Sequence, residues 1–233
     1  MRLDGLQSVL IVGSGDGLSA ALARKFSAAG LKVALAARNV GKLAPLAQQT
    51  GAQTFACDAT KPDDVERLFA DVAQGVGVPG IVVYNASARS RGPVADLVPA
   101  EVEQALAVTA FGGFLVGREA ARAMLPRGSG VILFTGASAS VKGYAQSAPF
   151  AMGKFALRGL AQSMARELGP KGIHVAHVVI DGAIRGARSP EPTDQPDSRL
   201  DPDAIADSYL HLASQPRSAW TFELEVRPFV ERF

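Results

Sequence analysis

The chain has 233 residues, of which 48% are hydrophobic and 20% are charged, with a net charge of +2. This composition predicts a globular protein with enough apolar surface for a large core. Basic and acidic residues are interspersed and no apolar stretch reaches the roughly 20 residues that span a bilayer, which argues against nucleic acid and membranes as partners.

Short apolar runs alternate with longer amphipathic segments from the first residues onward. In chain order, the first half predicts strand Ser8–Val12, helix Gly17–Ala29, strand Lys32–Ala37, helix Val40–Thr50, strand Thr54–Cys57, helix Pro62–Val76 and strand Ile81–Tyr84. The helices carry apolar residues at helical spacing, whereas the strands are continuous apolar runs bounded by turn residues.

The second half continues the alternation with longer helices. It predicts helix Pro99–Met124, strand Val131–Phe134, helix Phe150–Leu168, strand Ile173–Val179 and strand Glu223–Val226. Between the last two strands, Gly186 to Pro202 is rich in Ser, Pro, Asp and Arg and lacks an apolar stripe, which indicates a mobile loop.

Alternation of this kind favours a parallel sheet with helices on both faces. We therefore predict a Rossmann-type doubly wound α/β fold of about seven mainly parallel strands. Residues 1–233 form a single dinucleotide-binding domain, without repeats or low-complexity tracts.

A glycine-rich turn follows the first strand. The segment Gly13-Ser14-Gly15-Asp16-Gly17-Leu18 opens the first helix. Glycines let the backbone approach a pyrophosphate closely, and the helix N-terminus offers free N–H groups and partial positive charge. An ordinary tight turn is the alternative, and the carboxylate of Asp16 must point outward or cap the helix if phosphates bind here.

The end of the second strand bears on the choice of cofactor. An acidic residue there would bind the adenosine ribose and repel a 2′-phosphate. The sequence instead has Arg38, which can pair with a 2′-phosphate. This favours NADP(H) over NAD(H), the alternative being a solvated surface arginine.

From about Ser8 to Ile184, these residues resemble the short-chain dehydrogenase/reductase family. Its glycine motif is similar to Gly13-x-x-x-Gly17-Leu18, with Ser19 where a third glycine is usual. The resemblance implies that Asp58 contacts the adenine, with Ala59 beside it. It also matches the family's Asn-Asn-Ala-Gly motif to Tyr84-Asn85-Ala86-Ser87, and its Pro-Gly beside the nicotinamide to Asp181-Gly182, followed by Ile184.

The family's catalytic pattern of Asn, Ser, Tyr and Lys is incomplete in this chain. The segment Phe150-Ala151-Met152-Gly153-Lys154 keeps the lysine but has Phe150 in place of the tyrosine. In the family, this lysine contacts the cofactor ribose and lowers the pKa of the tyrosine, whose hydroxyl passes the proton. The resemblance places Thr109 at the asparagine position. It gives Ser138, or Ser140 as a second choice, at the serine position.

Three explanations of the missing tyrosine stay open. Another group could supply the proton, either Tyr144 or a water held by Ser138 and Lys154; Tyr144 could equally be a loop aromatic that packs on the surface. The protein could bind its cofactor without turnover. Finally, the reaction could need no general acid from the protein.

We therefore predict an NADP(H)-dependent oxidoreductase acting on a carbonyl or alcohol. The substrate is expected to be a small molecule, and the loop 186–202 is expected to lie on the substrate side of the domain. The alternative is a non-catalytic NADP(H)-binding sensor or assembly subunit.

The apolar segments 108–117 and 155–164 predict a homodimer or homotetramer, because the family pairs these helices across a twofold axis. Cys57 is the only cysteine, which fits a reducing, cytoplasmic setting. No metal site is expected, since His174 and His177 face opposite sides of a strand.

Overall fold

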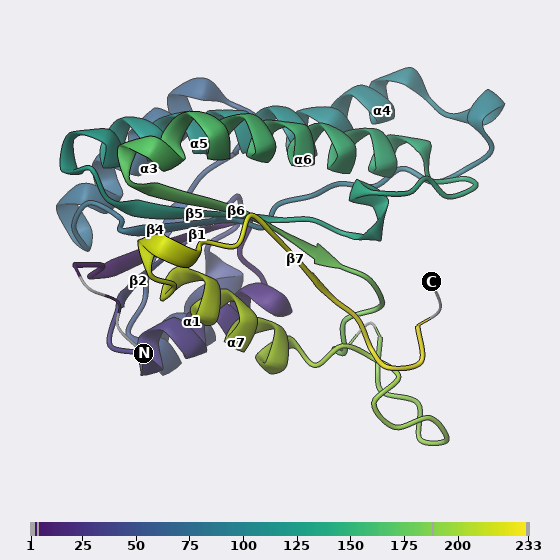
Figure 1. Ribbon diagram of the computed structural model, residues 1–233. Coiled ribbons are helices and arrows are strands. Elements are labelled where there is room, and N and C mark those ends of the chain that lie inside the picture. The colour runs from purple at the N-terminus through teal and green to yellow at the C-terminus, as the bar shows by residue number, and fades with distance from the viewer. Residues whose placement is uncertain (1–2, 4, 188, 232–233) are drawn as a thin grey trace.

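A computed structural model describes residues 3, 5–187 and 189–231. Seven strands form one sheet in the order β3-β2-β1-β4-β5-β6-β7, and every neighbouring pair is parallel. The sheet has helices on both faces (Figure 1). The predicted Rossmann-type fold is therefore confirmed.

The strands run from Ser8 into the last tenth of the chain. They are β1 Ser8–Val12, β2 Lys32–Ala37, β3 Gln53–Ala56, β4 Ile81–Tyr84, β5 Gly130–Thr135, β6 Ile173–Ile180 and β7 Glu223–Val226. The helices are α1 Leu18–Ala28, α2 Ala44–Thr50, α3 Pro62–Gly75, α4 Pro99–Leu106, α5 Gly112–Met124, α6 Ala148–Leu168 and α7 Pro202–Ala213. Most predicted boundaries lie within two residues of these.

Each face of the sheet has its own apolar core. In Figure 1, helices α3, α5 and α6 lie above the sheet, whereas α1 and α7 lie below it. The upper core joins residues such as Leu68, Val116 and Leu157 to the sheet, and the lower core does the same with Phe26 and Tyr209. Because both faces are covered, the strands read as continuous apolar runs.

The strand order reverses between β1 and β4. From β1 the chain builds outward through β2 to β3, and it then returns to place β4 on the other side of β1. The crevice above such a switch point, at the carboxyl ends of the strands, is where doubly wound sheets bind their ligands. The turns after Val12 and Tyr84 meet at this place.

Two elements differ from prediction. Helix α7 was missed: it begins at Pro202, where only the end of an irregular loop was expected, and Asp201 caps it by accepting a hydrogen bond from the backbone N–H of Asp203 at 2.9 Å. The helix predicted over 99–124 is interrupted by a π-helical segment, Ala107–Phe111. Such a segment inserts one extra residue per turn and often occurs at functional sites.

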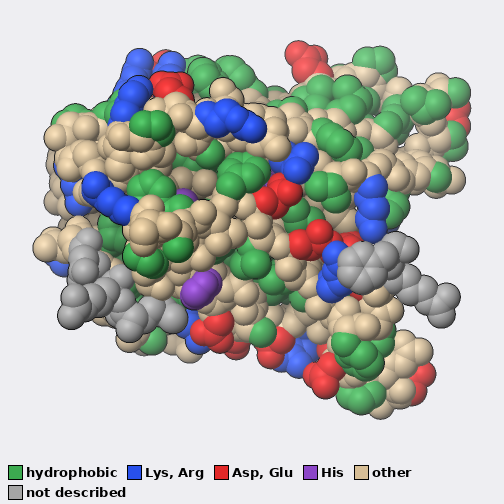
Figure 2. All heavy atoms as spheres, viewed as in Figure 1, with side chains coloured by type: hydrophobic (Ala, Val, Ile, Leu, Met, Phe, Trp, Pro, Cys, Tyr) green, Lys and Arg blue, Asp and Glu red, His purple; other side chains and the backbone are tan. Residues whose placement is uncertain are grey.

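Positive and negative side chains are interspersed over the face of the molecule shown in Figure 2. Within the described residues, no helix is both long enough and apolar enough to cross a membrane.

Candidate active site

A long cleft follows the carboxyl edge of the sheet over the switch point. It consists of two cavities of about 760 and 730 Å³, which share Asn85 and Ser87 in their walls. The first, which we call the adenosine half, adjoins the glycine-rich turn and the end of β2. The second, which we call the reacting half, adjoins the ends of β5 and β6 and the start of α6.

The glycine-rich turn is shaped by close approach of two backbones. Gly13 has a φ of +86°, which L side chains rarely adopt, and a Cβ there would lie 2.4 Å from the backbone nitrogen of Ala86. Only glycine allows the turn after β1 to lie this close to the turn after β4. The sequence argument for a glycine here therefore has a steric basis in the structure.

A short hydrogen-bond chain joins these two turns. The Asn85 side-chain amide donates to Oγ of Ser19 at 2.7 Å, and that hydroxyl donates to the carbonyl of Gly13 at 3.1 Å. Ser19 stands where the family has its third glycine, so this serine contributes a link that a glycine cannot make. Asn85 thus connects the two turns at the place where the two halves of the cleft meet.

The adenosine half contains cations that have no carboxylate partner. Among the described residues, Arg38 forms no ion pair or hydrogen bond, and Lys42 lies in the same wall. Asp58 lines the wall, and it also starts a turn by accepting hydrogen bonds from the backbone N–H and hydroxyl of Thr60 at 3.1 and 2.8 Å. Asp16 is exposed, as the binding of phosphates would require.

Lys154 lies at the floor of the reacting half. Its side chain is 3% exposed, and its ammonium donates to the carbonyl oxygen of Thr135 at 2.6 Å. Burial, and then the positive charge of Arg89, lower the pKa of Lys154 to about 7. The amine therefore loses its proton more readily near neutral pH than an exposed lysine does, which suits a group that takes part in proton transfer.

Phe150 takes the place that the family gives to tyrosine. It is 8% exposed, and its ring centre is 3.9 Å from the central carbon of the Arg89 guanidinium and 5.8 Å from the Lys154 ammonium. Two cations thus contact one aromatic ring. Cation–π attraction holds Arg89 over the ring, and nothing at this position offers a proton.

The structure distinguishes the two candidate serines. Ser138 lines the reacting half, whereas Ser140 is fully buried and its Oγ accepts a hydrogen bond from the backbone N–H of Ala137 at 3.1 Å. Tyr144 also lines the reacting half, at 46% exposed, with the Lys142 ammonium 5.8 Å from its ring. Ser138, Tyr144 and Lys154 therefore line the same cavity.

Thr109 lies beneath the cleft rather than in its wall. It is fully buried in the π-helical segment, and its Oγ1 accepts a hydrogen bond from the backbone N–H of Ala88 at 3.1 Å. The hydroxyl of Tyr84 donates to the carbonyl of Val108 in the same segment. These two contacts thus tie the distorted helix to the last residue of β4 and to the chain that follows it.

The two strand histidines point away from each other. His174 stacks on Trp220, with ring centres 4.9 Å apart, whereas Nδ1 of His177 lies 3.0 Å from a carboxylate oxygen of Glu223. Burial lowers the pKa of His177 to about 4 despite that carboxylate. In the part of the chain that the structure describes, no three His, Cys, Asp or Glu residues gather to hold a metal ion.

Most predicted site residues line the cleft. The adenosine half contains Gly13, Ser14, Gly15, Arg38, Asp58, Ala59, Asn85, Ala86 and Ser87, and the reacting half contains Leu18, Ser138, Tyr144, Phe150, Lys154, Gly182 and Ile184. Gly17 and Thr109 lie outside both walls. The sequence reasoning missed Lys42, Arg89, Arg91, Ser147 and Glu231, all of which line the cleft.

The chain matches the family model described as short chain dehydrogenase over residues 7–189. It therefore belongs to the short-chain dehydrogenase/reductase family of NAD(P)-dependent oxidoreductases.

Relatives agree with this assignment. The chain is 27% identical over 225 residues to an uncharacterized oxidoreductase of Staphylococcus aureus strain MRSA252, covering 94% of this chain and 96% of that protein. It is 31% identical over 178 residues to the 3-oxoacyl-[acyl-carrier-protein] reductase MabA of Mycobacterium avium, covering 76% of this chain and 67% of MabA.

Solved structures are similar over nearly the whole chain. A short-chain dehydrogenase from Rhodopseudomonas palustris has a TM-score of 0.83 at 37% identity, covering 98% of this chain and 100% of that one. A metagenomic short-chain oxidoreductase in complex with NADP has a TM-score of 0.84 at 29% identity, covering 97% and 99%.

Proposed function

We propose that this protein is an NADP(H)-dependent oxidoreductase that acts on a carbonyl or alcohol. The observation that carries the proposal is the continuous cleft, which has the glycine-rich turn at one end and buried Lys154 at the other. The two halves share Asn85 and Ser87, so one extended dinucleotide can occupy both.

The residues present fit such a cofactor. Gly13 leaves open the space that a side chain would fill, and among the described residues no side chain caps the N-terminus of α1, so its first N–H groups are available to a pyrophosphate. Arg38 and Lys42 are available for a 2′-phosphate, and no acidic residue stands at the end of β2 to repel it. The structure of a relative with NADP supports the same choice.

When bound, the nicotinamide exchanges a hydride with the substrate carbon. The protein's own residues must then orient the substrate and supply or remove one proton. Ser138 offers a hydroxyl to the substrate oxygen, and Lys154 offers an ammonium whose pKa is about 7. Tyr144, or a water held between Ser138 and Lys154, completes the proton path that Phe150 cannot provide.

A titration tests the cofactor before any substrate is known. NADPH and NADH are each added to the purified protein, and binding is followed by fluorescence of the reduced nicotinamide. Tighter binding of NADPH is the expected result. A screen of carbonyl compounds then follows oxidation of the cofactor. NADPH binding with no oxidation by any carbonyl would instead favour the cofactor-binding sensor or assembly subunit.

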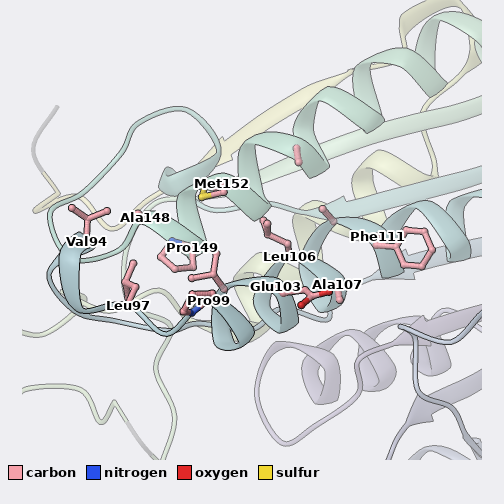
Figure 3. A pocket seen from close by; sticks show the side chains of 13 residues that line it. Val94, Leu97, Pro99, Glu103, Leu106, Ala107, Phe111, Ala148, Pro149 and Met152 are labelled. Carbon is pink, nitrogen blue, oxygen red and sulfur yellow. The ribbon is translucent and has the colours of Figure 1, made fainter.

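The apolar faces of α4, α5 and α6 favour a homo-oligomer. A groove of about 790 Å³ runs between α4 and α6, and Figure 3 shows its largely aliphatic lining, with Phe111 at one end. Phe111, Phe114 and Phe155 are each more than 40% exposed on this side. Pairing of these helices with a second copy would bury them. Light scattering at micromolar concentration tests this, and a monomer mass would contradict it.

Two further features stay as proposals. The loop 186–202, in which Arg188 lies outside the described residues, follows Ile184 in the chain; because Ile184 lines the reacting half, a position of this loop on the substrate side stays a proposal. Cys57 is buried and unpaired, in keeping with a reducing, cytoplasmic setting.

A further inference from the structure

The reacting half carries two arginines that no role above accounts for. Arg89 and Arg91 follow β4 and line the reacting half without lining the adenosine half. Among the described residues, neither has an ion pair or a hydrogen bond. By contrast, Arg24, Arg118 and Arg158 on other surfaces each have a carboxylate within 2.9 Å.

Arg89 is exposed, and it packs against the ring of Phe150. Its guanidinium lies 3.9 Å from the centre of the Phe150 ring, so an apolar surface holds one face of the guanidinium while its N–H groups remain available at the edge. Partial burial, and the nearby charge of Arg91, lower the pKa of Arg89. A guanidinium still keeps its charge at neutral pH.

Positive charge therefore exceeds negative charge in this wall. Its cationic residues are Arg89 and Arg91, with Lys154 charged only in part at neutral pH, and its carboxylates are Asp181 and Glu231. Asp181 is 3% exposed and faces Lys142 at 3.6 Å. Mutual repulsion between cations held this close is relieved by an anion placed between them.

Resting on the proposed oxidoreductase function, we infer that the substrate carries a carboxylate, which Arg89 binds with help from Arg91. The planar fork of a guanidinium matches the two oxygens of a carboxylate. Because Arg89 lies on the ring of Phe150, at the family's catalytic position, the carboxylate is placed close to the reacting carbon. The substrates indicated are small oxo acids or hydroxy acids.

Matched acids and esters test this inference. Pyruvate and phenylglyoxylate are compared with their methyl esters, which keep the ketone but lose the charge. Binding is measured by calorimetry at constant ionic strength, with and without NADPH. We expect each acid to bind the native protein at least tenfold more tightly than its ester. Inorganic phosphate serves as a competitor that has charge without the planar shape, and it should bind more weakly than the acids.

Variants locate the effect. Arg89→Gln should lose at least tenfold in acid affinity with no change in ester affinity, Arg91→Gln should lose less, and Arg89→Lys should be intermediate because it keeps charge without the fork. Arg166→Gln is the matched control, since Arg166 is exposed on α6 and bonds only the carbonyl of Gln162. Glu231→Gln should tighten acid binding.

Failures of the two proposals are distinguishable. Equal binding of acid and ester by the native protein, no acid binding at all, or an equal loss of acid and ester in Arg89→Gln would overturn the inference, even where NADPH binds. If NADPH does not bind but acid affinity still depends on Arg89, the inference stands and the proposed function fails. Unchanged circular dichroism establishes that each variant is folded.

Discussion

The adenosine and reacting halves of the cleft follow the family pattern to different degrees. The adenosine half keeps the glycine-rich turn, Asp58 and Asn85. Its departures are small side chains at glycine positions, Ser19 and Ser87, and Tyr84 before Asn85; Ser19 adds a hydrogen bond between the two turns. The reacting half keeps Lys154 and a serine but has Phe150 in place of the tyrosine.

The physical demands on the two halves explain this difference. The adenosine half must hold a cofactor of fixed shape, so the chain there is constrained by backbone approach, as at Gly13. The reacting half must suit one particular substrate, so its side chains can change while the backbone scaffold stays. Function is carried by the site and not by the fold, and here the site has changed more than the fold.

The sharpest test of this comparison is a pair of substitutions in the reacting half. If Tyr144 supplies the proton, Tyr144→Phe should lower turnover by at least about a hundredfold, because a positioned general acid contributes that much or more. Cofactor affinity should not change. Phe150→Tyr restores the Tyr-x-x-x-Lys spacing and should raise or create carbonyl reduction, measured by cofactor oxidation.

The two variants separate the explanations. A loss at Tyr144 alone supports a relocated acid. A gain at Phe150 with no loss at Tyr144 supports a repurposed reductase site. If neither variant changes the rate, Tyr144 has no part in catalysis.

In the adenosine half, the test is selectivity between cofactors. Arg38→Ala should weaken NADPH binding by tenfold or more, because one charge-assisted contact contributes about 1.5 to 3 kcal/mol. NADH binding should hardly change, since NADH has no 2′-phosphate. Lys42→Ala should show the same selectivity with a smaller loss. Equal weakening of both cofactors would show that Arg38 does not contact a 2′-phosphate.

The fold could be predicted from sequence because it depends on periodicity. Continuous apolar strands and amphipathic helices report burial directly, so most of the strand and helix boundaries needed little context. Helix α7 was missed because its first turn, with Asp201 and Asp203, continues a stretch rich in Pro, Asp and Ser. Its buried residues, such as Tyr209, are apparent once the helix is known; the Tyr209 hydroxyl lies 2.8 Å from Oγ1 of Thr135.

The site was only partly predictable for a different reason. Motif residues such as Gly13 and Lys154 have fixed spacing, but Arg89 and Arg91 gain meaning only when β4 is placed beside β5 and α6. Their signal in the sequence is modest: they follow the Tyr84–Ser87 motif at alternate positions, which puts both on one side of an extended segment. The apolar periodicity of the sequence does not reveal the π-helical segment. The hydroxyl of Tyr84, at the end of β4, donates a hydrogen bond to the carbonyl of Val108 in this segment, and that contact depends on tertiary structure.

A smaller effect concerns the stability of the reacting half. The pKa of Lys154 is about 7 in the folded protein, below its ordinary value of 10.5, so the unfolded chain binds more protons between these values. The free energy of unfolding should therefore rise with pH above 7, by up to about 1.4 kcal/mol per pH unit. Below pH 7 the amine is charged in both states, and this contribution levels off at its least favourable value.

Lys154→Met isolates this contribution. Urea unfolding is measured between pH 7 and 8.5 at one protein concentration, and the titration of Cys57 in the unfolded chain cancels because both proteins contain it. The native protein should gain stability relative to Lys154→Met across this interval. Parallel curves for the two proteins would mean that Lys154 is not desolvated as its 3% exposure indicates.

The smallest expected effect concerns Thr109 in the π-helical segment. It tests whether this segment positions only the reacting half of the cleft or both halves. Thr109→Val keeps the shape of the side chain but removes the acceptor for the Ala88 N–H, which should cost about 1 kcal/mol of stability. Thr109→Ser keeps the hydroxyl and serves as the matched control. Since Ala88 precedes Arg89 directly, the Val variant should weaken binding of a carboxylate substrate more than it weakens NADPH binding at Arg38. Equal losses at both ends of the cleft would mean that Thr109 supports the fold in general, and the two halves would then share one scaffold.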